Sequence, residues 1–90
     1  MIKKIKIEDL FEFIDYRKIN YYYNLRDNKK FGSSFITKNP RIDFIKNATL
    51  EELSDEDREV FKLAIREGYA VPKREYREKL LKFFFEGEII

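Results

Sequence analysis

Cations interleaved with aromatic rings fill the first half of the chain, and this is the pattern best suited to binding chemistry. Between positions 16 and 46 there are eight Lys or Arg residues and only two Asp residues. Cations bind phosphate groups, and exposed rings stack on bases. The pattern therefore predicts contact with nucleic acid, either DNA or RNA. The residues predicted to make it are Arg17, Lys18, Tyr21, Tyr22, Tyr23, Arg26, Lys29, Lys30, Lys38 and Arg41.

The same segment has a second interpretation. Surfaces of thermophilic proteins are rich in Lys, and Tyr rings often roof a small core with their hydroxyls outward. The net charge of the whole chain is only +2. A strongly basic architectural protein is therefore not expected.

Apolar residues near position 80 span a wider arc than one small core needs. Four of them lie at i, i+4, i+7 and i+8 and suffice for a core stripe: Tyr76, Leu80, Phe83 and Phe84. Leu81 and Phe85 lie about 100° further round a helix. In a purely structural interpretation, Phe85 packs on the N-terminal helix or the helix end frays. In a functional interpretation, the apolar side chains that the core does not need bind a protein partner or a second copy of the chain. The predicted partner-binding residues are Leu80, Leu81, Phe83, Phe84 and Phe85.

Residues 77–84, Arg-Glu-Lys-Leu-Leu-Lys-Phe-Phe, resemble the clamp-binding peptide of DNA replication and repair proteins. In that family an initial Gln is followed by an aliphatic residue and an aromatic pair, which enter an apolar pocket on the sliding clamp. The resemblance implies that Leu80 is the aliphatic plug and that Phe83 and Phe84 form the aromatic fork. Arg77 stands where the family has Gln, and a basic residue cannot reproduce all the hydrogen bonds of an amide.

A second segment, residues 53–60 with Gly68-Tyr69 and Val71-Pro72, resembles the opening helix and turn in bacterio-opsin-activator-type regulators. Those helix-turn-helix domains need a further recognition helix with exposed polar side chains. Three consecutive Phe residues, 83–85, stand in its place, so base-specific readout is not expected.

Much ordinary enzymology is excluded, because the chain has neither Cys nor His. Thiolate nucleophiles, Cys-ligated zinc and the commonest general base are therefore missing. An acidic cluster that could hold Mg²⁺ is interpreted as helix caps, since carboxylates stabilise helix N-termini. Its members are Glu51, Glu52, Asp55, Glu56, Asp57 and Glu59. The sequence thus predicts no catalytic residues, no metal site and no cofactor.

A small toxin-like ribonuclease is the alternative from another functional class. One arrangement would use an acid with a following Lys, such as Asp43 and Lys46. The other would draw an Arg/Lys/Tyr site from Arg17, Lys18, Tyr21 and Arg26. Neither has diagnostic spacing.

Two periodicities compete in the N-terminal half. The stripe of Ile7, Leu10, Phe11 and Ile14 predicts an amphipathic helix that extends to about Arg26. Residues 19–25 also alternate as a strand would, but no Gly or Pro interrupts the helical stripe, which favours the helix. Residues 34–37 and 42–45, joined by a turn with Asn39-Pro40, predict a β-hairpin around residues 33–45.

Helix signals dominate the second half. Ser54 and the acids after it cap a helix over residues 55–67, which Gly68 ends. Pro72 suits the first turn of a last helix over residues 73–86. The sequence therefore predicts one domain over residues 1–90, of the α+β class and dominated by helices, with a short hairpin and two C-terminal helices.

The composition, with 40% charged residues and no Trp, is typical of thermophiles, and abundant Lys, Ile, Phe, Tyr and Asn suit an archaeal cell or virus. No apolar run approaches the roughly 18 residues of a membrane span, and we expect a cytoplasmic protein. The predicted function is a non-enzymatic accessory or adaptor protein in archaeal DNA replication or repair. A small viral protein that inhibits host machinery is an alternative.

Overall fold

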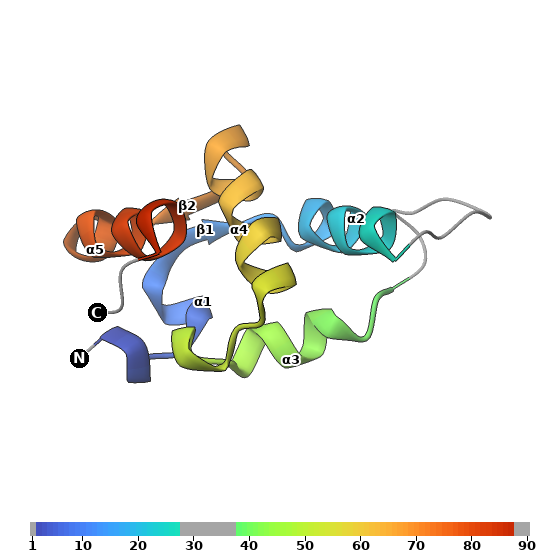
Figure 1. The fold of residues 1–90 in the computed structure, drawn as a ribbon, viewed down its shortest axis with the longest axis horizontal. Helices are drawn as coiled ribbons and strands as arrows, with labels where there is room; N and C mark the ends of the chain where they lie inside the picture. Colours follow the sequence, from blue (N-terminus) through green and yellow to red (C-terminus); the bar gives the residue numbers. More distant parts are fainter. Residues whose placement is uncertain (1, 28–37, 88–90) are drawn as a thin grey trace.

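Helix α4 (Asp55–Glu67) crosses the centre of the molecule, and the other elements surround it (Figure 1). The structure is a computed structural model and describes residues 2–27 and 38–87. Helices α2 and α5 lie at opposite ends of the long axis in this view. The described elements, in chain order, are η1 (Ile2–Lys4), α1 (Ile7–Leu10), β1 (Phe11–Ile14), α2 (Tyr16–Arg26), α3 (Arg41–Asn47), η2 (Leu50–Glu52), α4, β2 (Ala70–Pro72), η3 (Arg74–Tyr76), α5 (Arg77–Leu81) and η4 (Lys82–Glu86).

A two-stranded antiparallel sheet joins segments that are far apart in the sequence. Strand β1 pairs with β2, with Phe13 opposite Val71 and Ile14 opposite Ala70, and the register is irregular between Phe11 and Phe13. The ladder continues past both ends, because Asp15 N donates to the Tyr69 carbonyl at 2.7 Å and Lys73 N donates to the Leu10 carbonyl at 3.0 Å. The sheet therefore fixes the start of α2 next to the end of α4.

The N-terminal half is not one helix from residue 7 to 26. The prediction of a helix is confirmed for residues 17–26 and wrong for residues 11–14, which form β1. Asp15 explains the break, since its side chain accepts hydrogen bonds from Arg17 N at 3.1 Å and Lys18 N at 3.2 Å and so caps α2.

The predicted hairpin around residues 33–45 is wrong where the structure describes it, because residues 41–47 form α3. Asn39 starts this helix, since its side-chain oxygen accepts from Arg41 N at 2.9 Å. Ile42 and Ile45 then lie three residues apart on one buried face. In so short a run, the spacing of apolar residues fits both a strand and a helix. The other predicted strand, residues 34–37, lies outside the described residues.

The second half follows its local signals closely. Helix α4 has the predicted bounds, begins with a capping box between Ser54 and Asp57, and ends at Gly68, whose φ is 83°. The predicted last helix divides into the 3₁₀ turn η3, helix α5 and the π-helical segment η4. Pro72 belongs to β2 rather than to this helix. The predicted class is confirmed: the described chain is α+β and mostly helical, with its sheet in β1 and β2.

The core is aromatic where η4 packs against α4 and β1. Phe84 lies with its ring centroid 5.9 Å from that of Phe61 and 6.4 Å from that of Phe11. Phe83 meets Phe84 edge-on at 5.0 Å. Phe83 and Phe84 are each only 4% exposed, whereas Phe85 is 39% exposed. Two of the three consecutive rings therefore belong to the core.

Neighbouring Phe residues should thus respond very differently to truncation. We expect Phe84→Ala to lower the free energy of unfolding by about 3–5 kcal/mol, because it removes a buried ring. Phe85→Ala should cost less than about 1 kcal/mol, since its ring is partly in water. Urea unfolding followed by circular dichroism measures both. Equal losses in the two variants would contradict the packing described.

Candidate nucleic-acid interface

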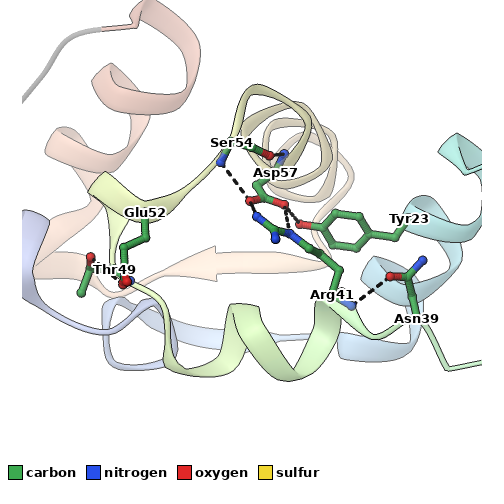
Figure 2. Close-up of polar contacts among 7 residues, drawn as sticks. All are labelled: Tyr23, Asn39, Arg41, Thr49, Glu52, Ser54 and Asp57. Carbon is green, nitrogen blue, oxygen red and sulfur yellow. Dashed lines mark hydrogen bonds and ion pairs between the residues drawn. The ribbon is translucent and has the colours of Figure 1, made fainter.

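A buried carboxylate, Asp57, joins three helices at the start of α4 (Figure 2). Its Oδ1 accepts from the Tyr23 hydroxyl at 2.7 Å and from Arg41 Nε at 2.9 Å. Its Oδ2 accepts from Arg41 Nη2 and from the backbone N of Ser54 at 2.9 Å. Tyr23 belongs to α2 and Arg41 to α3, so one side chain links α2, α3 and α4.

These contacts decide the protonation of Asp57. Burial acts to raise its pKa and is the largest single effect, but hydrogen bonds from Arg41, Ser54 and Tyr23 together outweigh it and hold the pKa below its usual value. In turn, the hydrogen bond to Asp57 is the main cause that raises the pKa of Arg41. Burial is the main cause that raises the pKa of Tyr23, and the hydrogen bond to Asp57 raises it further. Four hydrogen bonds occupy the acceptor sites of the carboxylate. Asp57 is therefore a structural anion rather than a general base.

This network corrects one predicted nucleic-acid contact. The Tyr23 side chain is fully buried, so its ring is not available to stack on a base. Arg41 is partly committed as well, since it pairs with Asp57 and its guanidinium carbon lies 4.2 Å from the centroid of the Phe44 ring. Tyr23 and Arg41, which were predicted to contact nucleic acid, thus hold the helices together.

Buried Asn residues fix α2 against the start of α3 in the same region. The backbone N of Asn39 donates to Asn20 Oδ1 at 2.6 Å. Asn39 Nδ2 donates to Asn24 Oδ1 at 2.9 Å and to Asp27 Oδ2 at 2.7 Å. The face of α2 that carries Asn20, Tyr23 and Asn24 is therefore directed inward.

An open pocket of about 280 Å³ lies beside this cluster. Its walls are formed by Asp27, Asn39, Pro40, Arg41, Phe44 and Glu56. Their charged groups already have partners, since Asp27 accepts from Asn39, Arg41 pairs with Asp57, and Glu56 pairs with Arg26 at 3.8 Å. The charged side chains that line this pocket therefore stabilise the fold rather than bind a ligand.

The outer face of α2 brings together four of the predicted contacts: Arg17, Lys18, Tyr21 and Tyr22. Positions i, i+1, i+4 and i+5 form a continuous stripe on a helix. Arg17 is exposed and the other three are half-buried. Leu25, one turn further along the stripe, is 49% exposed. The stripe presents cations and rings together on the outer side of α2, with Tyr22 packed partly against the core.

Tyr69, which lies between α4 and β2, extends this stripe, and the sequence analysis did not predict it. Its ring centroid lies 6.4 Å from that of Tyr22, and Tyr22 lies 6.0 Å from Tyr21. Lys18 Nζ lies 5.5 Å from the Tyr21 centroid and 5.0 Å from that of Tyr69. Tyr69 follows Gly68 at the end of α4, and no periodicity in the sequence relates it to α2.

Two more of the predicted cations have acidic partners and do not join this stripe. Arg26 pairs with Glu56, and Lys38 Nζ lies 2.9 Å from Asp43 Oδ1. Both Lys29 and Lys30 lie outside the described residues.

The geometry around Asp43 does not support the nuclease arrangement of Asp43 with Lys46. The hydrogen bond from Lys38 is the main cause that holds the pKa of Asp43 below its usual value, and Lys46 contributes less. Lys46 Nζ instead lies 5.1 Å from the centroid of the Tyr16 ring. Asp43 is thus paired with the Lys before it rather than the Lys after it.

The predicted partner-binding residues divide by exposure. Leu80, Phe83 and Phe84 are buried, which confirms the predicted core stripe and corrects the prediction that these three also bind a partner. These are the positions that correspond to the plug and fork of a clamp-binding peptide, so binding through them would require the helix to leave its own core. Leu81 is half-buried and Phe85 is exposed. Phe85 lies at a pocket of about 220 Å³ between η4 and the start of α4.

The acidic cluster largely serves caps and ion pairs. Glu52 Oε1 accepts from Thr49 N at 2.8 Å in a capping box around η2 (Figure 2). Glu59 pairs with Lys62 at 3.5 Å. Within residues 2–27 and 38–87, no group of three or more acidic side chains is placed to hold a metal ion.

Comparison with protein-family models, with curated proteins and with solved structures found no match to this chain. In the part of the chain that the structure describes, no helix has both the length and the apolar character needed to cross a membrane.

The buried carboxylate should dominate stability. We expect Asp57→Asn to lower the free energy of unfolding by about 3 kcal/mol at pH 7, because it leaves the Arg41 cation without its counterion. The pKa of Asp57 is lowered by folding, so its stabilisation is present above the pKa of an unfolded Asp, about 3.9, and is lost as pH falls through the folded-state value. The difference between wild type and variant should therefore be constant above about pH 5 and shrink below about pH 4.

Urea unfolding between pH 2 and 7 (roughly the titration range of carboxyl groups) measures this difference. Asp55→Asn is the control, since Asp55 is exposed and lies in the same first turn of α4. A difference that stays the same down to the lowest pH would show that the charge of Asp57 is not what stabilises the fold.

Proposed function

We propose that this protein is a non-enzymatic accessory protein that binds nucleic acid through the outer face of α2. The observation that carries the proposal is the stripe of Arg17, Lys18, Tyr21 and Tyr22 on one side of one helix. The opposite side of α2 is occupied by its contacts with α3 and α4. Of the outer residues, Arg17, Lys18 and Tyr21 lie outside the apolar core cluster, and Tyr22 packs partly against it.

Each kind of side chain in the stripe has a role with this ligand. Arg17 and Lys18 neutralise phosphates, which provides affinity that does not depend on base sequence. The Tyr rings add contacts to sugars or bases. Because the net charge of the chain is only +2, attraction is local to this face rather than spread over the whole surface. The proposal is thus a small contact site and not a wrapping protein.

A second surface in this proposal holds a protein partner or a second copy, which suits an accessory role in archaeal DNA replication or repair, or in viral inhibition of such machinery. After the burial of Leu80, Phe83 and Phe84, this surface centres on Phe85 with Leu81 at its side. In Figure 1, α5 and the segment after it lie at the opposite end of the molecule from α2. Both surfaces are therefore accessible at the same time.

Neutralising the stripe should weaken binding on every sequence alike. We expect the double variant Arg17→Ala with Lys18→Ala to reduce the slope of log affinity against log salt by roughly one unit for each phosphate that the protein no longer neutralises. Fluorescence anisotropy with labelled DNA and RNA at several salt concentrations measures the slope.

The matched control is Arg77→Ala with Lys79→Ala, which removes the same two charges from exposed positions of α5. An equal fall in both double variants would mean that only overall charge matters, and the α2 site would be rejected. If the wild-type protein instead cleaves the RNA and the Arg17/Lys18 double variant does not, the ribonuclease alternative would be supported.

Substitution in the proposed protein-binding surface should change association rather than nucleic-acid binding. Phe85→Ser should leave the fold intact and abolish self-association, because the most exposed ring of the C-terminal segment is removed. Sedimentation velocity at high protein concentration measures the oligomeric state, with Leu63→Ser, also exposed, as the control. A wild-type protein that stays monomeric and binds no clamp or other protein partner would contradict this part of the proposal.

A further inference from the structure

Three Tyr rings form a connected group around one ammonium on the outer side of α2. Tyr22 lies between Tyr21 and Tyr69, with ring centroids 6.0 Å and 6.4 Å away. Lys18 Nζ lies over both outer members, 5.5 Å from the Tyr21 centroid and 5.0 Å from that of Tyr69. We call Lys18, Tyr21, Tyr22 and Tyr69 the tyrosine platform.

Backbone hydrogen bonds hold Tyr69 beside α2. Tyr69 N donates to the Ala64 carbonyl at 2.8 Å, and the Tyr69 carbonyl accepts from Asp15 N at 2.7 Å. Asp15 in turn caps α2, which carries the other three members. Tyr69 is thereby fixed beside α2 before any ligand arrives. The side chains of Tyr22 and Tyr69 also pack partly against the core. Rings that are already ordered lose little conformational freedom on binding, which favours stacking.

The orientation of the rings favours unpaired bases. The planes of Tyr21 and Tyr22 are 49° apart, and those of Tyr22 and Tyr69 are 60° apart. Bases in a duplex are parallel and cover one another's faces, so tilted rings cannot stack on them in succession. Bases of a flexible single strand can each turn to meet a ring, and stacking of this kind does not depend on sequence.

We propose that the tyrosine platform selects single-stranded over double-stranded nucleic acid, with bases stacked on Tyr21, Tyr22 or Tyr69 and Lys18 exchanging its contact with the rings for a phosphate. This inference rests on the nucleic-acid binding proposed above and names its substrate class. It also assigns a binding role to Tyr69. The ammonium covers ring faces in the free protein, and a phosphate beside the stacked base provides a stronger partner for it.

A structural role for the same rings makes a different prediction. Tyr22 and Tyr69 pack partly against the core, so they could serve only as its cover. A cover needs apolar bulk, which Leu supplies, whereas stacking needs a flat ring, which Phe supplies. Comparing Leu and Phe at the same position therefore separates the two roles.

The first experiment measures anisotropy with a short labelled single strand of mixed sequence and with the same strand in a duplex. Wild type should prefer the single strand. Tyr69→Leu should weaken single-strand binding by about 5- to 150-fold, Tyr69→Phe should restore most of it, and duplex binding should change little in either variant. Tyr21→Leu repeats the comparison at a position outside the apolar core cluster, in case Tyr69→Leu does not fold.

The second experiment uses the absence of Trp from the chain. In Tyr21→Trp the single indole should lose fluorescence when the single strand is added and change little with the duplex. Equal binding of single strand and duplex, or equal losses in the Leu and Phe variants, would overturn the platform while leaving the salt-dependent binding site in place. If no nucleic acid binds in a salt-dependent manner, both the platform and the proposed function fail.

Discussion

The ionised carboxylate of Asp57 is the constraint on which the arrangement of the helices depends. It is fully buried, and burying an unpaired charge would be prohibitive, so each of its oxygens must receive hydrogen bonds. Tyr23 and Arg41 provide them from α2 and α3, and Ser54 provides one from the start of α4 itself. The angle at which α2 meets α4 is therefore restricted to one that places the Tyr23 hydroxyl on this carboxylate.

That restriction also decides what α2 presents to the outside. Tyr23 is directed inward, and on a helix the residues one and two positions before it are then rotated by about 100° and 200° away from the core contact. Tyr21 and Tyr22 consequently lie half-exposed with Lys18, next to Tyr69. Three adjacent Tyr residues thus have two different roles, and the buried one orients the other two. The inner face of α2 stabilises the fold, and its outer face carries the proposed binding site.

Features with local causes were predictable from the sequence. The capping box at Ser54 and the left-handed Gly68 gave the bounds of α4, since each acts within a few residues. The strand predicted for residues 42–45 is a helix because the short run fits both periods: Ile42 and Phe44 have strand spacing, whereas Ile42 and Ile45 have helical spacing. The side chain that selects the helix, Asn39, is itself held by Asn20 and Asn24 from α2. Nothing in the sequence distinguishes Tyr23 from Tyr22, because the partner that buries it is 34 residues away. Tyr69 was missed for the same reason, since its neighbours on α2 are distant in the chain.

The NMR spectrum of the Tyr rings during titration with a single-stranded oligonucleotide tests most directly whether the outer face of α2 binds bases. Selective ¹³C labelling of Tyr resolves the ring signals, and Tyr→Phe variants assign them. We expect the signals of Tyr21, Tyr22 and Tyr69 to shift with a common affinity, while the signal of buried Tyr23 stays in place. Shifts that centre on Tyr76 beside α5, or no shift in any Tyr signal, would contradict this expectation.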